Sequence, residues 1–155
     1  MQKELLDVKI NKQIRIFLLD DGFQVNEFTP FDMQIFDIIQ EIYTTTLTFT
    51  TYDVWTRLFN KSKQQATIES LNAINLSVFK ISRMFLKIDI KIIENGKQKE
   101  YEEGGTLLST FEFLPYENGI QYSYKAPSPN YHYLSKCELK EMLQKIIENK
   151  RIIKE

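Results

Sequence analysis

Residues 28–93 carry the pattern from which a fold can be predicted, and they read FTPFDMQIFDIIQEIYTTTLTFTTYDVWTRLFNKSKQQATIESLNAINLSVFKISRMFLKIDIKII. Thr29 is a suitable N-cap, because its hydroxyl can accept a hydrogen bond from a free backbone N–H of the first helical turn. Pro30 suits the first helical position, and Asp32 completes a pattern close to a capping box. The apolar residues that follow recur at three-to-four spacing and predict one buried helix face, made of Phe31, Ile35, Ile38, Ile39 and Ile42.

The threonines at residues 44–46 end the first helix, because they favour extended or capping geometry. A short strand is expected at residues 47–49, followed by a second helix. Thr50 and Asp53 repeat the capping pattern. Residues 60–65 are polar and basic, the composition expected of the turn before a recognition helix. The buried face of this second helix is predicted to hold Val54, Trp55, Leu58 and Phe59.

The third helix is predicted over about residues 66–85, with a buried stripe of Ile68, Leu71, Ile74, Val78, Ile81 and Phe85 at helical period. Amide and basic side chains on the opposite face are the types that read base edges and hold phosphates, and an ordinary solvated face is the alternative. Leu76 on that face fits neither interpretation, and marks either a partner contact or a contact with a thymine methyl group. The whole predicted exposed face is Glu69, Asn72, Ala73, Leu76, Lys80 and Arg83.

From Leu86 the apolar period changes to two, which predicts a strand, and Asn95-Gly96 predicts a tight turn after it. We expect residues 97–105 to form a long loop tip and residues 106–114 to return as a strand. Three helices followed by such a hairpin predict an α+β fold, a winged helix-turn-helix in which this hairpin is the wing. Lys97 would then lie near the DNA minor groove or backbone, although the acidic residues at 100, 102 and 103 oppose such a contact.

The flanking segments add an N-terminal β-hairpin, predicted from residues 14–19 and 23–28 around Asp21-Gly22, with residues 1–12 as a strand or an ordered arm. A second hairpin is expected from residues 111–114 and 120–124. Ser135 is a plausible N-cap for a C-terminal helix that either docks on its own domain or dimerises; its apolar stripe is Leu139, Met142, Leu143, Ile146 and Ile147. The expected segments are an arm at 1–28, the winged-helix region at 29–125 and a loop with the last helix at 126–155, within one domain overall.

Composition excludes several classes of protein. The 155 residues are 43% hydrophobic and 13% aromatic, which excludes a disordered chain. No apolar run is as long as a membrane span and no signal peptide is evident, so a cytoplasmic location is expected. A single cysteine and a single histidine exclude a disulfide framework and a zinc finger. Since Cys137 and His132 have no catalytic partners in the pattern, we predict no enzyme activity and no cofactor, metal or small-molecule ligand.

The net charge is only −1, but basic residues are concentrated in one stretch. Residues 57–91 hold seven basic residues against two acidic ones. A local positive region suffices to engage phosphates, because charges interact over only about 10 Å in physiological salt. The predicted contacts with double-stranded DNA are Arg57, Lys61, Lys63, Gln65, Asn72, Lys80, Arg83 and Lys97.

The pattern from Phe28 to Leu108 resembles the winged-helix replication initiator proteins of plasmids and mobile elements from low-GC Gram-positive bacteria. The likeness is carried by residues 28–32 at the first helix, 49–50 before the second, and Ile88-Asp89 entering the wing; further matches are Ile74, Ser77, Lys80, Ile81, Gly105, Leu107 and Leu108. The resemblance implies a protein that binds origin or operator DNA to initiate or regulate replication, with a possible homodimer. The alternative is a winged-helix module for protein interaction or transcriptional regulation without initiator activity.

Overall fold

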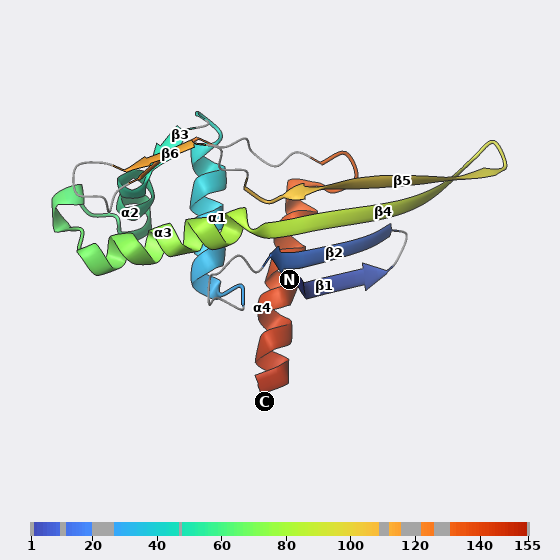
Figure 1. Ribbon diagram of the computed structural model, residues 1–155, viewed down its shortest axis with the longest axis horizontal. Helices are drawn as coiled ribbons and strands as arrows, with labels where there is room; N and C mark the ends of the chain where they lie inside the picture. The colour runs from blue at the N-terminus through green and yellow to red at the C-terminus, as the bar shows by residue number, and fades with distance from the viewer. Residues whose placement is uncertain are drawn as a thin grey trace. The chain divides into compact units, whose positions relative to one another are not determined.

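Antiparallel β-hairpins and four α-helices make up the described part of the chain in a computed structural model (Figure 1). The structure describes residues 2–9, 12–19, 27–46, 48–108, 112–115, 122–125 and 131–154. The fold is of mixed α+β class. Its elements are β1 (Gln2–Lys9), β2 (Lys12–Leu19), α1 (Pro30–Ile42), β3 (Thr48–Thr50), α2 (Thr51–Phe59), η1 (Lys63–Gln65), α3 (Ile68–Ser82), β4 (Met84–Glu94), β5 (Lys97–Thr106), β6 (Glu112–Pro115), β7 (Tyr122–Lys125) and α4 (Lys136–Lys154).

The chain divides into two compact units. The first, here called the sheet unit, comprises Met1–Phe28, Arg83–Leu107 and Pro129–Glu155. The second, the helix unit, comprises Thr29–Ser82 and Leu108–Ser128. The domain boundaries predicted from the sequence, at residues 28 and 125, stay a prediction.

The sheet unit is built on an antiparallel sheet whose described strands run in the order β1-β2-β4-β5 (Figure 1). Alternation of apolar and polar residues buries one face of the sheet, as expected for the period of two. Ile16 and Leu86, for example, pair across β2 and β4, and both are buried. The five apolar residues predicted as the stripe of the C-terminal helix are also buried, and α4 contacts β1.

The hairpin of β4 and β5 differs from the predicted wing. Strand β5 begins directly after the two-residue turn at Asn95 and Gly96, which have φ of 51° and 75°, so residues 97–105 are not a loop. The charged composition of residues 97–105 suggests a loop, but opposite charges face each other across the hairpin and stabilise a strand instead. The ion pairs are Lys87 with Glu102 at 3.0 Å, Lys91 with Glu100 at 3.9 Å, and Lys99 with Glu94 at 3.1 Å.

The other edge of β4 pairs with β2, so this hairpin belongs to the sheet unit. The wing predicted here is not confirmed. The first strand of the predicted N-terminal hairpin is β2, which pairs with β1 on one edge and with β4 on the other. Residues 23–26 of the predicted second strand lie outside the described residues. The turn at Asp21-Gly22 lies outside the described residues.

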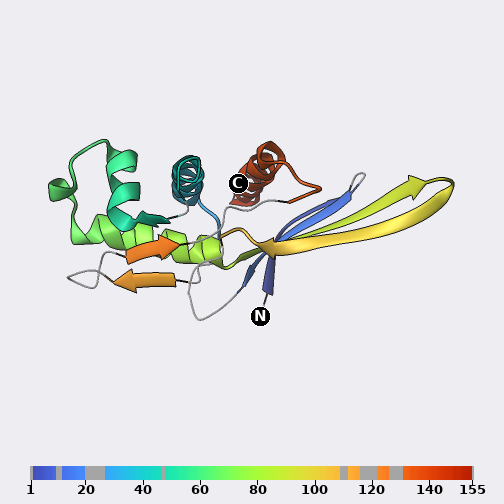
Figure 2. The ribbon, with the colours of Figure 1, turned by 90° about the horizontal axis from the view of Figure 1, so that it is seen from above.

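The helix unit contains α1, α2, α3 and a smaller sheet with its described strands in the order β3-β7-β6. The predicted hairpin in residues 111–124 is confirmed as β6 and β7, which run antiparallel (orange in Figure 2), and β3 pairs with β7. The turn between β6 and β7 lies outside the described residues.

Capping boxes begin α1 at Thr29 and Asp32 and α2 at Thr50 and Asp53, as predicted. Two apolar residues predicted to be buried are exposed instead: 43% of Phe59 and 61% of Ile68 are accessible to solvent. They are the last residue of α2 and the first of α3, where the neighbouring helices no longer cover the apolar stripe. Helix α3 is also shorter than predicted, because Phe85 already belongs to β4.

A search of the described helices finds none that is both long and apolar enough to span a membrane.

The Tyr131 hydroxyl is expected to make the stability of the sheet unit change with pH in the alkaline range. It donates to the carbonyl oxygens of Gly105 and Thr106, at 3.4 and 3.3 Å. Burial, and next the charge of Glu103, raise the pKa of Tyr131 from 10.0 to about 12. An unfolded chain therefore loses this proton first, so the contribution to stability is complete below pH 10 and is lost as the pH rises toward 12.

We expect urea unfolding at a series of alkaline pH values to show a steeper loss of stability for the wild type than for Tyr131→Phe. The Phe variant should be less stable by about 1 kcal/mol below pH 10, because it lacks the hydrogen bonds. Parallel curves for the two proteins between pH 10 and 12 would show that this hydroxyl does not titrate as described.

Candidate nucleic-acid interface

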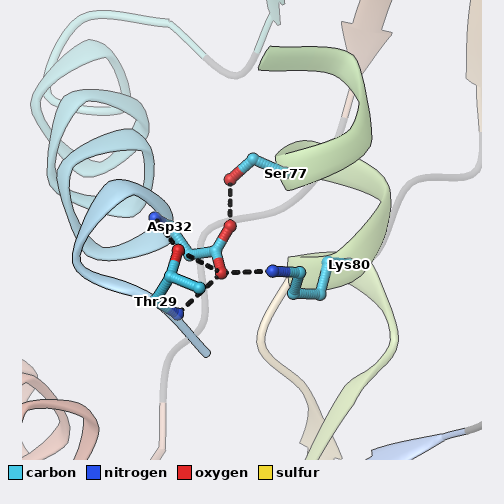
Figure 3. Close-up of polar contacts among 4 residues, drawn as sticks. All are labelled: Thr29, Asp32, Ser77 and Lys80. Atoms are coloured by element: carbon cyan, nitrogen blue, oxygen red, sulfur yellow. Dashed lines mark hydrogen bonds and ion pairs between the residues drawn. The ribbon is translucent and has the colours of Figure 1, made fainter. Parts of the chain in front are cut away.

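The orientation of α3 against α1 is set by a buried carboxylate. Asp32, only 1% exposed, accepts hydrogen bonds from the Ser77 hydroxyl at 2.7 Å and from the Lys80 ammonium at 2.5 Å (Figure 3). The backbone N–H and the hydroxyl of Thr29 donate to the same carboxylate at 2.8 and 2.9 Å. One side chain at the start of α1 is therefore bonded to two residues near the C-terminal end of α3, which fixes the rotation of α3 about its axis.

Two further side-chain hydrogen bonds join α3 to α2. The Thr51 hydroxyl donates to the Asn75 amide oxygen at 2.8 Å, and both residues are buried. The Trp55 indole donates to the Ser70 hydroxyl at 2.9 Å. These bonds act on the first half and the middle of α3, whereas Asp32 acts near its end. The inner face of α3 therefore carries polar partners between its buried apolar residues, which apolar periodicity does not reveal.

The turn before α3 is short and exposed. Asn60 ends α2 in a left-handed conformation with φ 53°, and the 3-10 turn η1 follows. Thr67 and Ser70 cap the start of α3 through reciprocal bonds from their backbone N–H groups to each other's hydroxyls, at 3.1 and 3.2 Å. Asn60 and Thr67 thus end α2 and begin α3, and the side chains of residues 61–65 between them are exposed.

The exposed side chains of this turn and helix are here called the α3 face. Six of its members, all in the helix unit, carry polar or large apolar side chains that a ligand could contact. They are Lys61, Lys63, Gln65, Ile68, Asn72 and Leu76. Four of the predicted DNA contacts, Lys61, Lys63, Gln65 and Asn72, are among these exposed side chains.

The other four predicted contacts lie elsewhere. Placing Lys80 on the solvent-exposed face was wrong, because it is only 8% exposed and is paired with Asp32. Its position on the helix predicted exposure, but the first turn of α1 covers this end of α3. Arg57 is exposed on α2 and pairs with Glu41 at 3.5 Å. Arg83 and Lys97 are exposed and belong to the sheet unit.

Ion pairs reduce the positive charge predicted for residues 57–91. Four of the seven basic residues in that range are paired with carboxylates: Arg57, Lys80, Lys87 and Lys91. Among the residues that the structure describes, Lys61 and Lys63 have no ion pair. Within residues 57–82 of the helix unit, the basic side chains without an ion pair are therefore those of the turn that leads into α3.

Within the described ranges there is no group of three or more histidine, cysteine, aspartate or glutamate side chains placed to hold a metal ion. Cys137 and His132 are both exposed. The absence of enzyme activity stays a prediction.

No protein-family model matches the chain. No curated protein matches it either. Among solved structures, it is similar to the crystal structure of domains 2 and 3 of RctB, at 12% sequence identity and a TM-score of 0.47. The alignment covers 81% of this chain and 52% of that one, so the chain spans about half the length of the structure it matches. A likeness at this level carries no argument about function, and the family resemblance seen in the sequence stays a prediction.

Removing the negative charge of Asp32 should destabilise the protein strongly, because it leaves the Lys80 ammonium buried without a counter-ion. We expect Asp32→Asn to lower the free energy of unfolding by about 3–5 kcal/mol. The double variant Asp32→Asn/Lys80→Met should recover much of this loss, because neither charge then remains buried alone. Urea unfolding of the three proteins measures both effects.

The matched control is Glu41→Gln, which breaks the exposed pair with Arg57 and should cost less than about 1 kcal/mol. If Asp32→Asn cost no more than this control, the carboxylate would not hold α3 in place.

Proposed function

We propose that the helix unit is a winged helix-turn-helix that binds double-stranded DNA through the α3 face. The order α1-β3-α2-α3-β6-β7, with β3 paired to the β6–β7 hairpin, supports this fold. In a helix-turn-helix, the second helix of the pair lies in the major groove, and here that helix is α3. The wing is then the β6–β7 hairpin, and the β4–β5 hairpin is an insertion between α3 and the wing.

The observation that carries the proposal is the division of α3 into two faces. The inner face is bonded to α1 and α2, whereas the outer face exposes an amide, apolar side chains and the carboxylate of Glu69. The turn before it exposes two lysines that have no ion pair among the described residues. Lys61 and Lys63 would hold phosphates, and Asn72 would face base edges. Sequence-specific DNA binding requires a fixed helix that offers hydrogen-bonding groups to the bases and cationic side chains to the phosphates.

A second candidate function is protein binding by the same surface. It is favoured by the exposure of Phe59, Ile68 and Leu76, because large apolar side chains in contact with water often mark an interaction site. Salt separates the two functions, since phosphate binding weakens steeply with salt and apolar association does not. A role in initiating or regulating the replication of a plasmid or mobile element is proposed on the sequence resemblance alone.

The double variant Lys61→Ala/Lys63→Ala should weaken binding to a fluorescent duplex of random sequence. Each phosphate contact contributes about 0.9 to the slope of log affinity against log salt, so we expect the slope to fall by about 2. Fluorescence anisotropy at several salt concentrations measures the affinity and the slope together. Both lysines are exposed, so the stability of the fold should not change.

The matched control is Lys136→Ala/Lys145→Ala, which removes the same charge from exposed positions on α4. An equal loss of affinity in this control would mean that binding depends on net charge and not on the turn before α3. Binding that does not respond to salt in the wild type would favour the protein-binding function.

A further inference from the structure

The α3 face carries two large apolar side chains that do not pack in the core. Ile68 and Leu76 are 61% and 51% exposed, and the buried residues Leu71, Ile74, Val78 and Ile81 already pack the inner face. Asn72 lies between the two in sequence, so the three side chains fall at four-residue intervals along one side of the helix. The result is an exposed stripe in which an amide is flanked by aliphatic groups.

The length of this stripe matches a few base pairs. A helix rises about 1.5 Å per residue, so consecutive members of the stripe are about 6 Å apart and its ends about 12 Å apart. Since stacked base pairs are about 3.4 Å apart, the stripe covers about three or four of them along a major groove.

The chemistry of the stripe selects among the bases. The side chain of asparagine can bond to both N6 and N7 of adenine, and aliphatic groups contact the C5-methyl group of thymine. The commonest contact with guanine is made by arginine or lysine. Residues 68–79 contain neither, and the ammonium of Lys80 is held by Asp32 in the interior. The stripe therefore has groups for both bases of an A·T pair and no cation for guanine.

We propose that the α3 face reads A·T base pairs, with Asn72 bonded to an adenine and with Ile68 and Leu76 against thymine methyl groups on either side. This inference rests on the proposed function and names the DNA that the same surface selects. DNA is the occupant favoured over a protein because the turn that leads into α3 exposes Lys61 and Lys63, whose charge complements phosphates flanking the groove.

The test compares two duplexes that differ only in the C5-methyl groups of thymine. Short duplexes with a randomised centre are enriched for binding to the full chain, and the best site is synthesised again with deoxyuridine in place of thymidine. The charge and the base pairing stay the same. We expect enriched sites to be rich in A·T pairs, and the thymine duplex to bind about fourfold more tightly for each methyl group contacted.

The variant Leu76→Ala should reduce the ratio between the thymine and uracil duplexes, because it removes one methyl contact. Leu76 is exposed, so this variant keeps the fold, which thermal unfolding checks. The matched control is Ile93→Ala, which shortens a side chain that is 77% exposed in the sheet unit and should leave the ratio unchanged. Repeating the enrichment with Asn72→Ala should relax the preference for adenine.

Equal affinity of the wild type for the thymine and uracil duplexes, or enriched sites dominated by G·C pairs, would overturn this inference while leaving the proposed function in place. A ratio that Leu76→Ala does not change would overturn the part assigned to Leu76 and return it to the protein-binding candidate. No binding to any duplex at low salt would overturn the inference and the proposed function together.

Discussion

The arrangement of the helix unit depends on the carboxylate of Asp32. A buried carboxylate is costly unless hydrogen-bond donors surround it, and here donors come from Thr29, Ser77 and Lys80. Because these donors are at the start of α1 and near the end of α3, the two helices can satisfy the charge in only one relative rotation. The bond between Thr51 and Asn75 sets the same rotation further along α3. The exposure of Ile68, Asn72 and Leu76 follows from these bonds.

Features that depend on residues close in sequence could be predicted from the sequence. The capping boxes at Thr29 and Thr50, and the reciprocal bonds of Ser135 and Glu138 at α4, involve residues three positions apart. Features that depend on distant partners could not. The choice of β2 as the neighbour of β4 joins segments about seventy residues apart, and an alternating pattern fits several partners equally well. The β4–β5 hairpin was assigned to the helical region for that reason, whereas the β6–β7 hairpin, whose strands are close in sequence, was predicted.

The residues of the candidate site also fall into those that the sequence could predict and those that it could not. Exposure of Lys61, Lys63, Gln65 and Asn72 was predicted correctly, because short polar turns and the outer face of an amphipathic helix seldom find covering partners. The burial of Lys80 could not be predicted, because helical period does not reveal where another helix begins alongside. Counting charges along the chain also overstated the positive region, since cross-strand and interhelical carboxylates are invisible to such a count.

Amide hydrogen exchange, compared with and without a bound duplex, tests most directly whether DNA lies on the helix unit. We predict that a duplex slows exchange in residues 61–76, which form the turn and the exposed side of α3, and leaves β4 and β5 unchanged. Slower exchange confined to the β4–β5 hairpin, with none in α3, would contradict this account and restore that hairpin as the surface that contacts DNA.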